Sequence, residues 1–223
     1  MHYTQMEASE NCPCLTCKLT EKAHMASGSG HLSAVGSSPT PLHMQSAEQQ
    51  KQWFVLRDFK KWNAKSPGYK ELPRLGIQCF TPMHWIVTTR RDVRKREYVP
   101  VIQNLLFAFD SRAILDPVIE RESTLQYQFR RGAGSGVPMT VDEQEMERFI
   151  SAVGNDPAPV YYSPDELTED MIGKEVVVTG GPLDGYRGRL LKLRGTKKRR
   201  VIIEIRGFIA AAVEVNPAFI QLV

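Results

Sequence analysis

Long apolar runs are missing from this chain of 223 residues. A helix that spans a bilayer needs about 20 consecutive apolar residues, and no stretch approaches that length. The N-terminus also lacks the basic patch followed by an apolar segment that marks a secretion signal. We therefore expect a cytoplasmic protein without a membrane partner.

Histidine is scarce where the chain is expected to fold. Of the five histidines, only His84 lies beyond residue 50. No serine or cysteine nucleophile motif accompanies it, so we expect a surface or sheet residue and not a catalytic base. The acidic residues that follow Val141 suit the first turns of a helix, where carboxylates interact favourably with the helix dipole. The sequence thus predicts a binding protein that is not an enzyme and needs no cofactor.

Cysteine is also rare, with four residues in the whole chain. Cys12, Cys14 and Cys17 are bunched at the start, and the fourth lies in an apolar stretch. This pattern is no disulfide framework, in keeping with a reducing compartment. The three thiols, with His24 or His31, are candidate zinc ligands, but their spacing matches neither paired Cys-x-x-Cys knuckles nor a Cys pair with a His pair. We therefore expect no metal site.

The composition leaves room for one or two compact cores, with 42% hydrophobic residues and a mild net charge of +4. Residues 1–50 are poor in aromatic and β-branched side chains and rich in Ser, Gly and Pro, which predicts a disordered tail. Beyond the tail we expect a folded domain over residues 51–153, a proline-containing linker over 154–170 and a small domain over 171–223.

Residues 51–153 alternate between strand and helix patterns. Short strands are predicted at 53–57, 77–81, 85–89, 98–102, 105–109 and 125–129, and helices at 66–76 and 113–122. Pro73 is expected to kink or shorten the first helix, and Asp116-Pro117 to mark an early break or bend in the second. Thr140 to Glu143 form a capping box, and Met146, Phe149, Ile150 and Val153 then follow one helical face. This order predicts an α+β fold, with one antiparallel sheet covered by helices.

A basic cluster lies between two of these predicted strands. It comprises Arg90, Arg91, Arg94, Lys95 and Arg96. Apolar residues flank the cluster on both sides, so we expect it at the tip of a β-hairpin. One interpretation is a solvated tip that binds nothing. The other is contact with the phosphates or bases of nucleic acid, because arginine provides both charge and stacking.

The strand from Leu105 to Phe109 is apolar throughout. Such a strand has both faces away from water. Plain core packing is one explanation for Ile102, Leu105 and Phe107. The other is that one face packs on helices while the second face meets a partner protein.

The segment from Gly173 to Leu190 carries the most specific motif of the chain. A β-branched run enters a Gly-Gly-Pro turn, and a second strand follows. Gly180 or Gly181 is expected to take a positive φ, and Gly188 to let two backbones approach closely. A phosphate-binding loop would need a Gly-x-x-x-x-Gly-Lys-Ser/Thr pattern and a following helix, and this segment has neither the lysine nor the helix.

The remaining C-terminal residues predict a small β-barrel. Strands are expected near 175–179, 187–193, 201–206, 210–215 and 219–223, and a closed sheet avoids bare edges. A basic turn at residues 197–200 separates two of these strands. It is interpreted either as a solvated loop or as a contact with RNA.

The spacing and residue types of the Gly-Gly-Pro segment resemble the KOW motif. That motif belongs to a small SH3-like barrel found in NusG-type transcription elongation factors and in some ribosomal proteins. The motif residues here are Gly180, Gly181, Pro182, Leu183, Gly185 and Gly188.

The upstream part of the chain resembles the N-terminal domain of the NusG family. Residues 53–55 are similar to its Trp-Tyr/Phe-aliphatic start, residues 77–82 to its Gly-aliphatic-x-x-Phe-x-Pro segment, and residues 100–108 to its polymerase-facing strand. The likeness covers residues 53–223 and is strongest to specialised paralogs, the UpxY-type antiterminators of Bacteroidetes that act on surface-polysaccharide operons. It extends more distantly to RfaH. RfaH-like relatives can hold the C-terminal domain as a helical hairpin, but the β-branched patterns here favour the barrel.

The resemblance implies a partner and a binding surface. The partner is the pair of clamp helices of the RNA polymerase largest subunit, bound by Trp53, Phe54, Phe80, Ile102, Leu105 and Phe107. The basic hairpin would touch non-template DNA in the transcription bubble, and pausing and termination would be suppressed. Ile102, Gln103 and Leu105 replace the usual Phe, Pro and Tyr of the polymerase-facing strand, so an aromatic anchor is missing there.

The barrel is expected to recruit a second partner, the small ribosomal subunit or Rho, and the protein is expected to be a monomer. Two alternatives stay open. One is a general NusG that couples to Rho or the ribosome, and the other is a ribosome-associated KOW protein that binds RNA.

Overall fold

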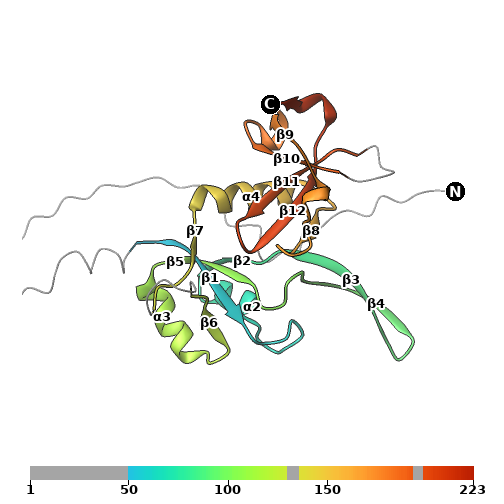
Figure 1. The fold of residues 1–223 in the computed structure, drawn as a ribbon. Coiled ribbons are helices and arrows are strands. Elements are labelled where there is room, and N and C mark those ends of the chain that lie inside the picture. Colours follow the sequence, from blue (N-terminus) through green and yellow to red (C-terminus); the bar gives the residue numbers. More distant parts are fainter. Residues whose placement is uncertain (1–49, 130–135, 193–197) are drawn as a thin grey trace, which may run out of the picture.

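The computed structural model describes residues 50–129, 136–192 and 198–223. The predicted tail, with Cys12, Cys14 and Cys17, lies outside the described residues. Within them the chain forms two antiparallel sheets, a separate two-stranded hairpin and three α-helices (Figure 1). The predicted mixture of antiparallel sheet and few helices is therefore confirmed.

The first sheet is built around strand β1 (Gln52–Asp58). β1 pairs with β5 (Leu106–Asp110), which pairs in turn with β2 (Gln78–Phe80). On its other side β1 pairs with β6 (Leu125–Tyr127) and β7 (Thr140–Val141). All these pairs are antiparallel.

One face of the first sheet is covered by two short helices, α2 (Gly68–Arg74) and α3 (Arg112–Arg121). Leu72 and Leu115 pack there against Phe54 and Leu106. Helix α2 ends at Arg74, directly after Pro73, and is shorter than predicted. Helix α3 continues through Pro117, so the chain does not break there. In α2, Pro73 has no N–H to offer the Tyr69 carbonyl, and the Cys79 thiol approaches that carbonyl oxygen at 3.8 Å instead.

Helix α4 (Glu143–Asn155) is amphipathic. It buries Met146, Phe149 and Val153, three of the four residues predicted on one face, and Ile150 packs against the same core while partly buried. The predicted capping box is wrong, because Thr140 belongs to β7. Asp142 caps the helix instead, and its Oδ1 accepts hydrogen bonds from the backbone N–H groups of Gln144 and Glu145 at 3.0 and 3.1 Å.

Strands β3 (Met83–Arg90) and β4 (Val93–Pro100) form the hairpin, which pairs with no other described strand and projects away from both sheets (Figure 1). Its turn consists of Arg91 and Asp92, whose φ angles of 49° and 62° match a two-residue turn of the type favoured by hairpins. The hairpin was predicted correctly, and the basic cluster surrounds its tip, with Arg91 in the turn and the other members on the adjoining strand ends. Arg94, Lys95 and Arg96 belong to β4.

The second sheet has the strand order β13-β9-β10-β11-β12-β8. Its members are β8 (Val160–Tyr162), β9 (Ile172–Val178), β10 (Arg187–Leu191), β11 (Arg200–Ile205), β12 (Ile209–Glu214) and β13 (Ile220–Leu222), with 3-10 turns at Glu169–Met171, Gly181–Leu183 and Pro217–Phe219. Strand β8 lies inside the segment that the sequence predicts as a linker and pairs with β12. Among the described residues, no pairing joins β13 to β8, so a closed barrel stays a prediction.

The glycine-rich turn has the expected backbone. Gly180 and Gly181 have φ angles of 117° and 71°, in the region that disfavours other residues. Position 188 requires a glycine, because a Cβ there would lie 3.0 Å from the Ile202 carbonyl oxygen on the neighbouring strand.

The two sheets share one hydrophobic core, with α4 between them (Figure 1). From the first sheet it includes Trp53, Val55 and Phe107, and from α4 it includes Phe149. The second sheet contributes Ile203, Ile205, Phe208, Ile209, Ala211 and Val213. The second face of the first sheet is thus covered by the chain's own C-terminal part.

Candidate functional site

The predicted polymerase-binding residues lie on β1, β2, β5 and the turn before β5, and they are largely buried. Exposure is at most 8% for Trp53, Phe54, Phe80, Leu105 and Phe107, and Ile102 is partly buried. The structure places Phe54 on the opposite face of the sheet, under α2 and α3. The other five face α4 and the second sheet. In this structure the C-terminal part of the chain occupies this face, so the face is not open toward a partner, and its role in polymerase binding stays a prediction.

Aromatic contacts join this face of the first sheet to α4 and to the second sheet, which together cover it. The ring of Phe208, which lies between β11 and β12, meets Phe107 edge-on with centroids 6.0 Å apart. Phe149 of α4 meets Phe80 edge-on at 6.1 Å. Edge-to-face pairs of this kind add to the stabilisation from area burial alone.

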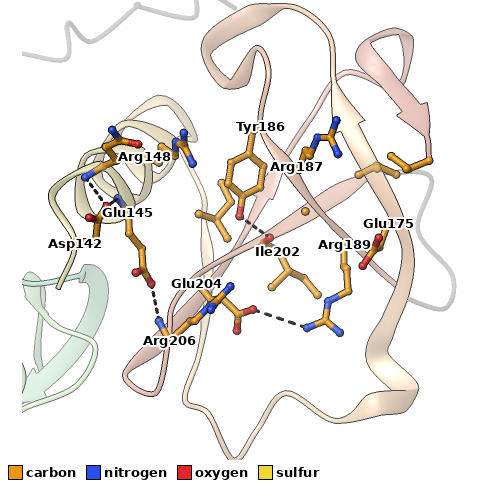
Figure 2. A pocket seen from close by; sticks show the side chains of 15 residues that line it. Asp142, Glu145, Arg148, Glu175, Tyr186, Arg187, Arg189, Ile202, Glu204 and Arg206 are labelled. Carbon is orange, nitrogen blue, oxygen red and sulfur yellow. Dashed lines mark hydrogen bonds and ion pairs between the residues drawn. The ribbon is translucent and has the colours of Figure 1, made fainter.

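Polar contacts hold α4 and the residues after it to the second sheet. The Glu145 carboxylate accepts a hydrogen bond from the Arg206 backbone N–H at 2.9 Å (Figure 2). At the end of α4, the buried Asp156 carboxylate accepts from the N–H groups of Ala158 and Glu214, both at 2.8 Å. Charged acceptors of this kind make the stronger hydrogen bonds in proteins.

Arg200 ties the predicted linker to the second sheet. Its side chain is buried, at 8% exposure, and Nη1 donates to the carbonyls of Ala158 at 3.1 Å and Ala212 at 2.9 Å. Lys198 forms an ion pair with Glu214 at 2.6 Å. The interpretation of residues 197–200 as a solvated loop or an RNA contact is therefore wrong for Arg200, which is structural.

A cleft of about 630 Å³ opens between α4 and strands β9, β10 and β11 (Figure 2). Charges of both signs line it: Arg148, Arg187, Arg189, Arg206, Asp142, Glu145, Glu175 and Glu204. Arg189 and Glu204 lie 3.8 Å apart, and Glu145 is held by Arg206. Because the charges are mixed, the cleft provides no concentrated field for an anion or a cation.

Tyr186 occupies the wall of this cleft. Its hydroxyl donates to the Ile202 carbonyl at 3.2 Å, and burial, with the nearby Glu204 charge, raises the pKa of Tyr186 to about 12. A phenol with this pKa stays protonated at neutral pH and acts as a hydrogen-bond donor. Within residues 50–129, 136–192 and 198–223, no three His, Cys, Asp or Glu side chains are grouped as metal ligands.

The KOW-like residues form the turn that faces α4. The Gly180 N–H donates to Asp184 Oδ1 at 2.6 Å, which closes the turn. Leu183 is partly buried against the shared core, whereas Pro182 and Gly185 are exposed. The motif therefore takes part in the contact with the first part of the chain.

The hairpin is the exposed part of the candidate site. Trp85 is 60% exposed and Val87 is 63% exposed, and Arg91, Arg94, Lys95 and Arg96 are all exposed. Only the backbone of Arg90 is described, as the last residue of β3. His84, predicted as a surface or sheet residue, is exposed on β3.

Sequence reasoning missed the residues of the second sheet that form the cover. The signal was present in the apolar runs of β11 and β12, where residues 201–203 and 208–213 lack polar alternation. A strand with one solvated face alternates, whereas a run that is apolar on both faces indicates burial on both. Read in this way, the runs predict a second packing surface beyond the small domain's own core.

No helix among the described residues is long and apolar enough to cross a membrane. No family model matches the chain, and no curated protein does either. Solved structures that are similar to the chain do exist.

The chain is similar to a solved NusG structure. That structure is described as "Domain interaction in Thermotoga maritima NusG". The match covers 78% of this chain and 98% of the other at 12% identity, with a TM-score of 0.39. At these values the likeness carries no argument about the function of this chain.

Proposed function

We propose that this protein is a transcription elongation factor of the NusG type that binds RNA polymerase and nucleic acid and is not an enzyme. The observation that carries the proposal is the combination of two surfaces on one chain. One is an apolar sheet face whose cover is the chain's own C-terminal part, and the other is the exposed cationic hairpin β3–β4. The residues that resemble the N-terminal domain of the NusG family, 53–55, 77–82 and 100–108, lie mainly on the strands of the first sheet and in the turn before β5.

The polymerase contact uses the covered face around Leu105 and Phe107. Its partner is the pair of clamp helices of the largest subunit, received as helices in an apolar groove. The groove becomes available only when Phe208 and the second sheet leave, so a closed and an open form are in equilibrium. A partner that binds the open form alone shifts the population by its differential affinity, and its apparent affinity is reduced by the fraction that is closed.

The finer role follows the sequence resemblance. The factor suppresses pausing and termination at surface-polysaccharide operons in the manner of UpxY-type antiterminators, acting in the cytoplasm as a monomer. The hairpin contacts non-template DNA in the transcription bubble. The second sheet, completed as an SH3-like barrel, is released for a second partner such as the small ribosomal subunit or Rho.

The test compares the full chain with Phe208→Ser, which removes the ring that packs on Phe107. Because Phe208 belongs to the cover, the variant is expected to open more often and to bind purified core polymerase more tightly, with more read-through of a terminator in vitro. The matched control is Leu222→Ser, at an exposed position of the second sheet. Substituting Phe107 itself is less informative, because that side chain is fully buried.

The outcomes separate the candidate functions. If neither the full chain nor Phe208→Ser binds polymerase, the proposal is wrong. Co-sedimentation with ribosomes but not with polymerase selects the ribosome-associated RNA-binding alternative. Occupancy across the whole genome, instead of a few operons, selects a general elongation factor.

A further inference from the structure

The segment that follows α4 is bound to the second sheet. Residues 156–162, which we call the strap, end in strand β8, and β8 pairs antiparallel with β12 (Figure 1). The register places Val160 opposite Ala212 and Tyr162 opposite Ala210. Tyr162 also packs, partly buried, against the small core that Ala210 and Ala212 form within the second sheet. The strap is therefore an outer strand of that sheet and not a free linker.

Two buried charged side chains fasten the beginning of the strap. Asp156 and Arg200 are each 8% exposed. The Asp156 carboxylate accepts a hydrogen bond from the Glu214 N–H on β12, and Arg200 Nη1 donates to the carbonyls of Ala158 and Ala212. A buried charge that loses its hydrogen-bond partners keeps the full cost of its desolvation. These contacts therefore oppose peeling of the strap from β12.

The contact between the two sheets is of a different kind. It consists of apolar packing in the shared core, where the rings of Phe208 and Phe107 meet. The hydrogen bond from the Arg206 N–H to the Glu145 carboxylate, which joins the second sheet to α4, is exposed. Water replaces an exposed hydrogen bond at little cost. Separation of the sheets and peeling of the strap thus break different sets of contacts.

The boundary between α4 and the strap is short. Val153 is buried in the shared core, and Asp156 is the first residue fastened to β12. Gly154 and Asn155 lie between them and are both exposed. Hinges consist of a few residues at the ends of elements, which absorb the change in backbone angles. These two residues meet that description.

We propose that the strap travels with the second sheet when the two sheets separate, so that the chain turns at Gly154 and Asn155, and that peeling of the strap is a second step opposed by Arg200. While the strap is held, the released sheet stays beside the face that it covered.

Peeling of the strap changes the reach of the second sheet. Residues 156–171 then become a tether, and a flexible chain of about 16 residues spans on the order of 20 Å. A longer tether lowers the effective concentration of the second sheet at the face of the first sheet. The fastened strap therefore favours closure, and Arg200 sets how readily the chain closes again.

This inference deepens the proposed function and rests on it for the existence of an open form. Its test needs no polymerase, so the outcomes of the two can be told apart. The competing possibility is a strap that detaches as the sheets separate, as expected of a linker.

The test measures hydrogen exchange by NMR in the full chain and in Phe208→Ser, which favours the open form. The indole N–H of Trp53 reports separation of the sheets, because Trp53 is 2% exposed in the shared core. The amide of Glu214 reports the strap, because it donates to Asp156. In Phe208→Ser the Trp53 indole is expected to exchange faster, whereas the Glu214 amide keeps its wild-type rate.

Arg200→Met tests the fastening. The variant keeps an unbranched side chain and removes the N–H groups, so the Glu214 amide is expected to exchange about tenfold faster. The Trp53 indole is also expected to exchange faster, because a longer tether makes closure less favourable. The matched control is Arg199→Met, whose arginine is the exposed neighbour in the sequence and which should leave both rates unchanged.

The Val178 amide, which donates to the Tyr186 carbonyl within the second sheet, checks that this sheet stays folded in Arg200→Met. If Val178 loses its protection too, the comparison with Phe208→Ser decides alone.

Equal acceleration of Glu214 and Trp53 in Phe208→Ser shows a strap that peels as the sheets separate and overturns the proposal. Wild-type exchange of Glu214 in a folded Arg200→Met overturns the role of Arg200. An unchanged Trp53 indole in Phe208→Ser overturns both the strap and the open form on which the polymerase contact depends. Separation with the strap in place, by a chain that does not bind polymerase, upholds the strap and refutes the proposed function.

Discussion

Strand β5 and the hairpin β3–β4 are both rich in apolar and aromatic side chains, but these side chains are buried on β5 and exposed on the hairpin. Phe107 on β5 has no exposed surface, whereas Trp85 on the hairpin is 60% exposed. Strand β5 has a neighbouring strand on each side and packed layers on both faces, whereas the two hairpin strands pair only with each other. Exposure of apolar side chains thus follows from how many other elements reach a strand.

The two regions also differ in what a binding partner must displace to reach them. A ligand reaches the exposed side chains of the hairpin, such as Trp85 and Val87, without rearranging the two sheets. A partner of β5 must first displace Phe208 and the strands around it, so its binding is linked to the stability of the contact between the two sheets. The following predictions test this contrast, beginning with the largest effect.

Phe107→Ala is expected to lower the free energy of unfolding by about 3–5 kcal/mol, because a fully buried aromatic side chain leaves a cavity that its neighbours only partly fill. Val87→Ala, on the exposed hairpin, is the matched control and is expected to change the free energy by less than about 0.5 kcal/mol. Urea unfolding monitored by circular dichroism measures both. Similar losses for the two variants would remove the contrast between the regions.

Asp156→Ala is expected to cost about 1–3 kcal/mol, because the backbone N–H groups of Ala158 and Glu214 both lose their acceptor. This carboxylate holds the end of α4 against the second sheet, so the variant also tests what secures the cover over β5. Asp165→Ala, at an exposed position after β8, is the control and is expected to be near neutral. If Asp156→Ala is equally neutral, the hydrogen bonds of Asp156 do not secure the cover.

Lys95→Ala is expected to have the smallest effect, confined to the face of the hairpin where Lys95 and Thr88 contact Glu97. The variant removes the leading cause of the lowered Glu97 pKa, so that pKa should rise toward its ordinary value of 4.5 and stay somewhat low because Thr88 still donates. A lowered carboxyl pKa contributes stability above pH 4.5 that is lost as the pH falls through the folded-state pKa, and the variant should lose that contribution. NMR titration of Glu97 measures the shift.

The control for this titration is Lys65→Ala, an exposed lysine outside the hairpin, which should leave the Glu97 titration unchanged. An unchanged Glu97 pKa in Lys95→Ala would show that the ion pair does not form in solution. The side chains of Lys95 and Glu97 would then be solvated separately, which would sharpen the contrast between the exposed hairpin and the packed strand β5.

Much of the local structure was predictable because it depends on near neighbours in the sequence. The two-residue turn at Arg91 and Asp92 joins apolar flanks into a hairpin, and the positive φ angles of Gly180 and Gly181 follow from the Gly-Gly-Pro pattern. Boundaries were less accurate where two signals compete. Thr140 was expected to cap α4, but strand pairing with β1 takes Thr140 and leaves the capping role to Asp142.

The sequence predicted which residues belong to the candidate site, but it did not predict whether their side chains are exposed or buried. The sequence correctly marked Phe107 as apolar on a strand, whereas Leu105 lies just before that strand, and it predicted the basic side chains at the tip of a hairpin. It did not place Phe208 against Phe107, because about a hundred residues separate them and no local pattern encodes that distance. Arg200 was misjudged for the same reason, since its carbonyl partners come from β12 and from the segment before β8.

The sequence by itself determined the alternation of strands and helices, the turns that glycine and short polar residues require, and which strands avoid water on both faces. Only the tertiary structure decided which surface covers each apolar face, because burial depends on elements brought together from distant parts of the chain. For this reason the same apolar pattern that marked β5 as a surface for another protein is satisfied here by the second sheet of the same chain.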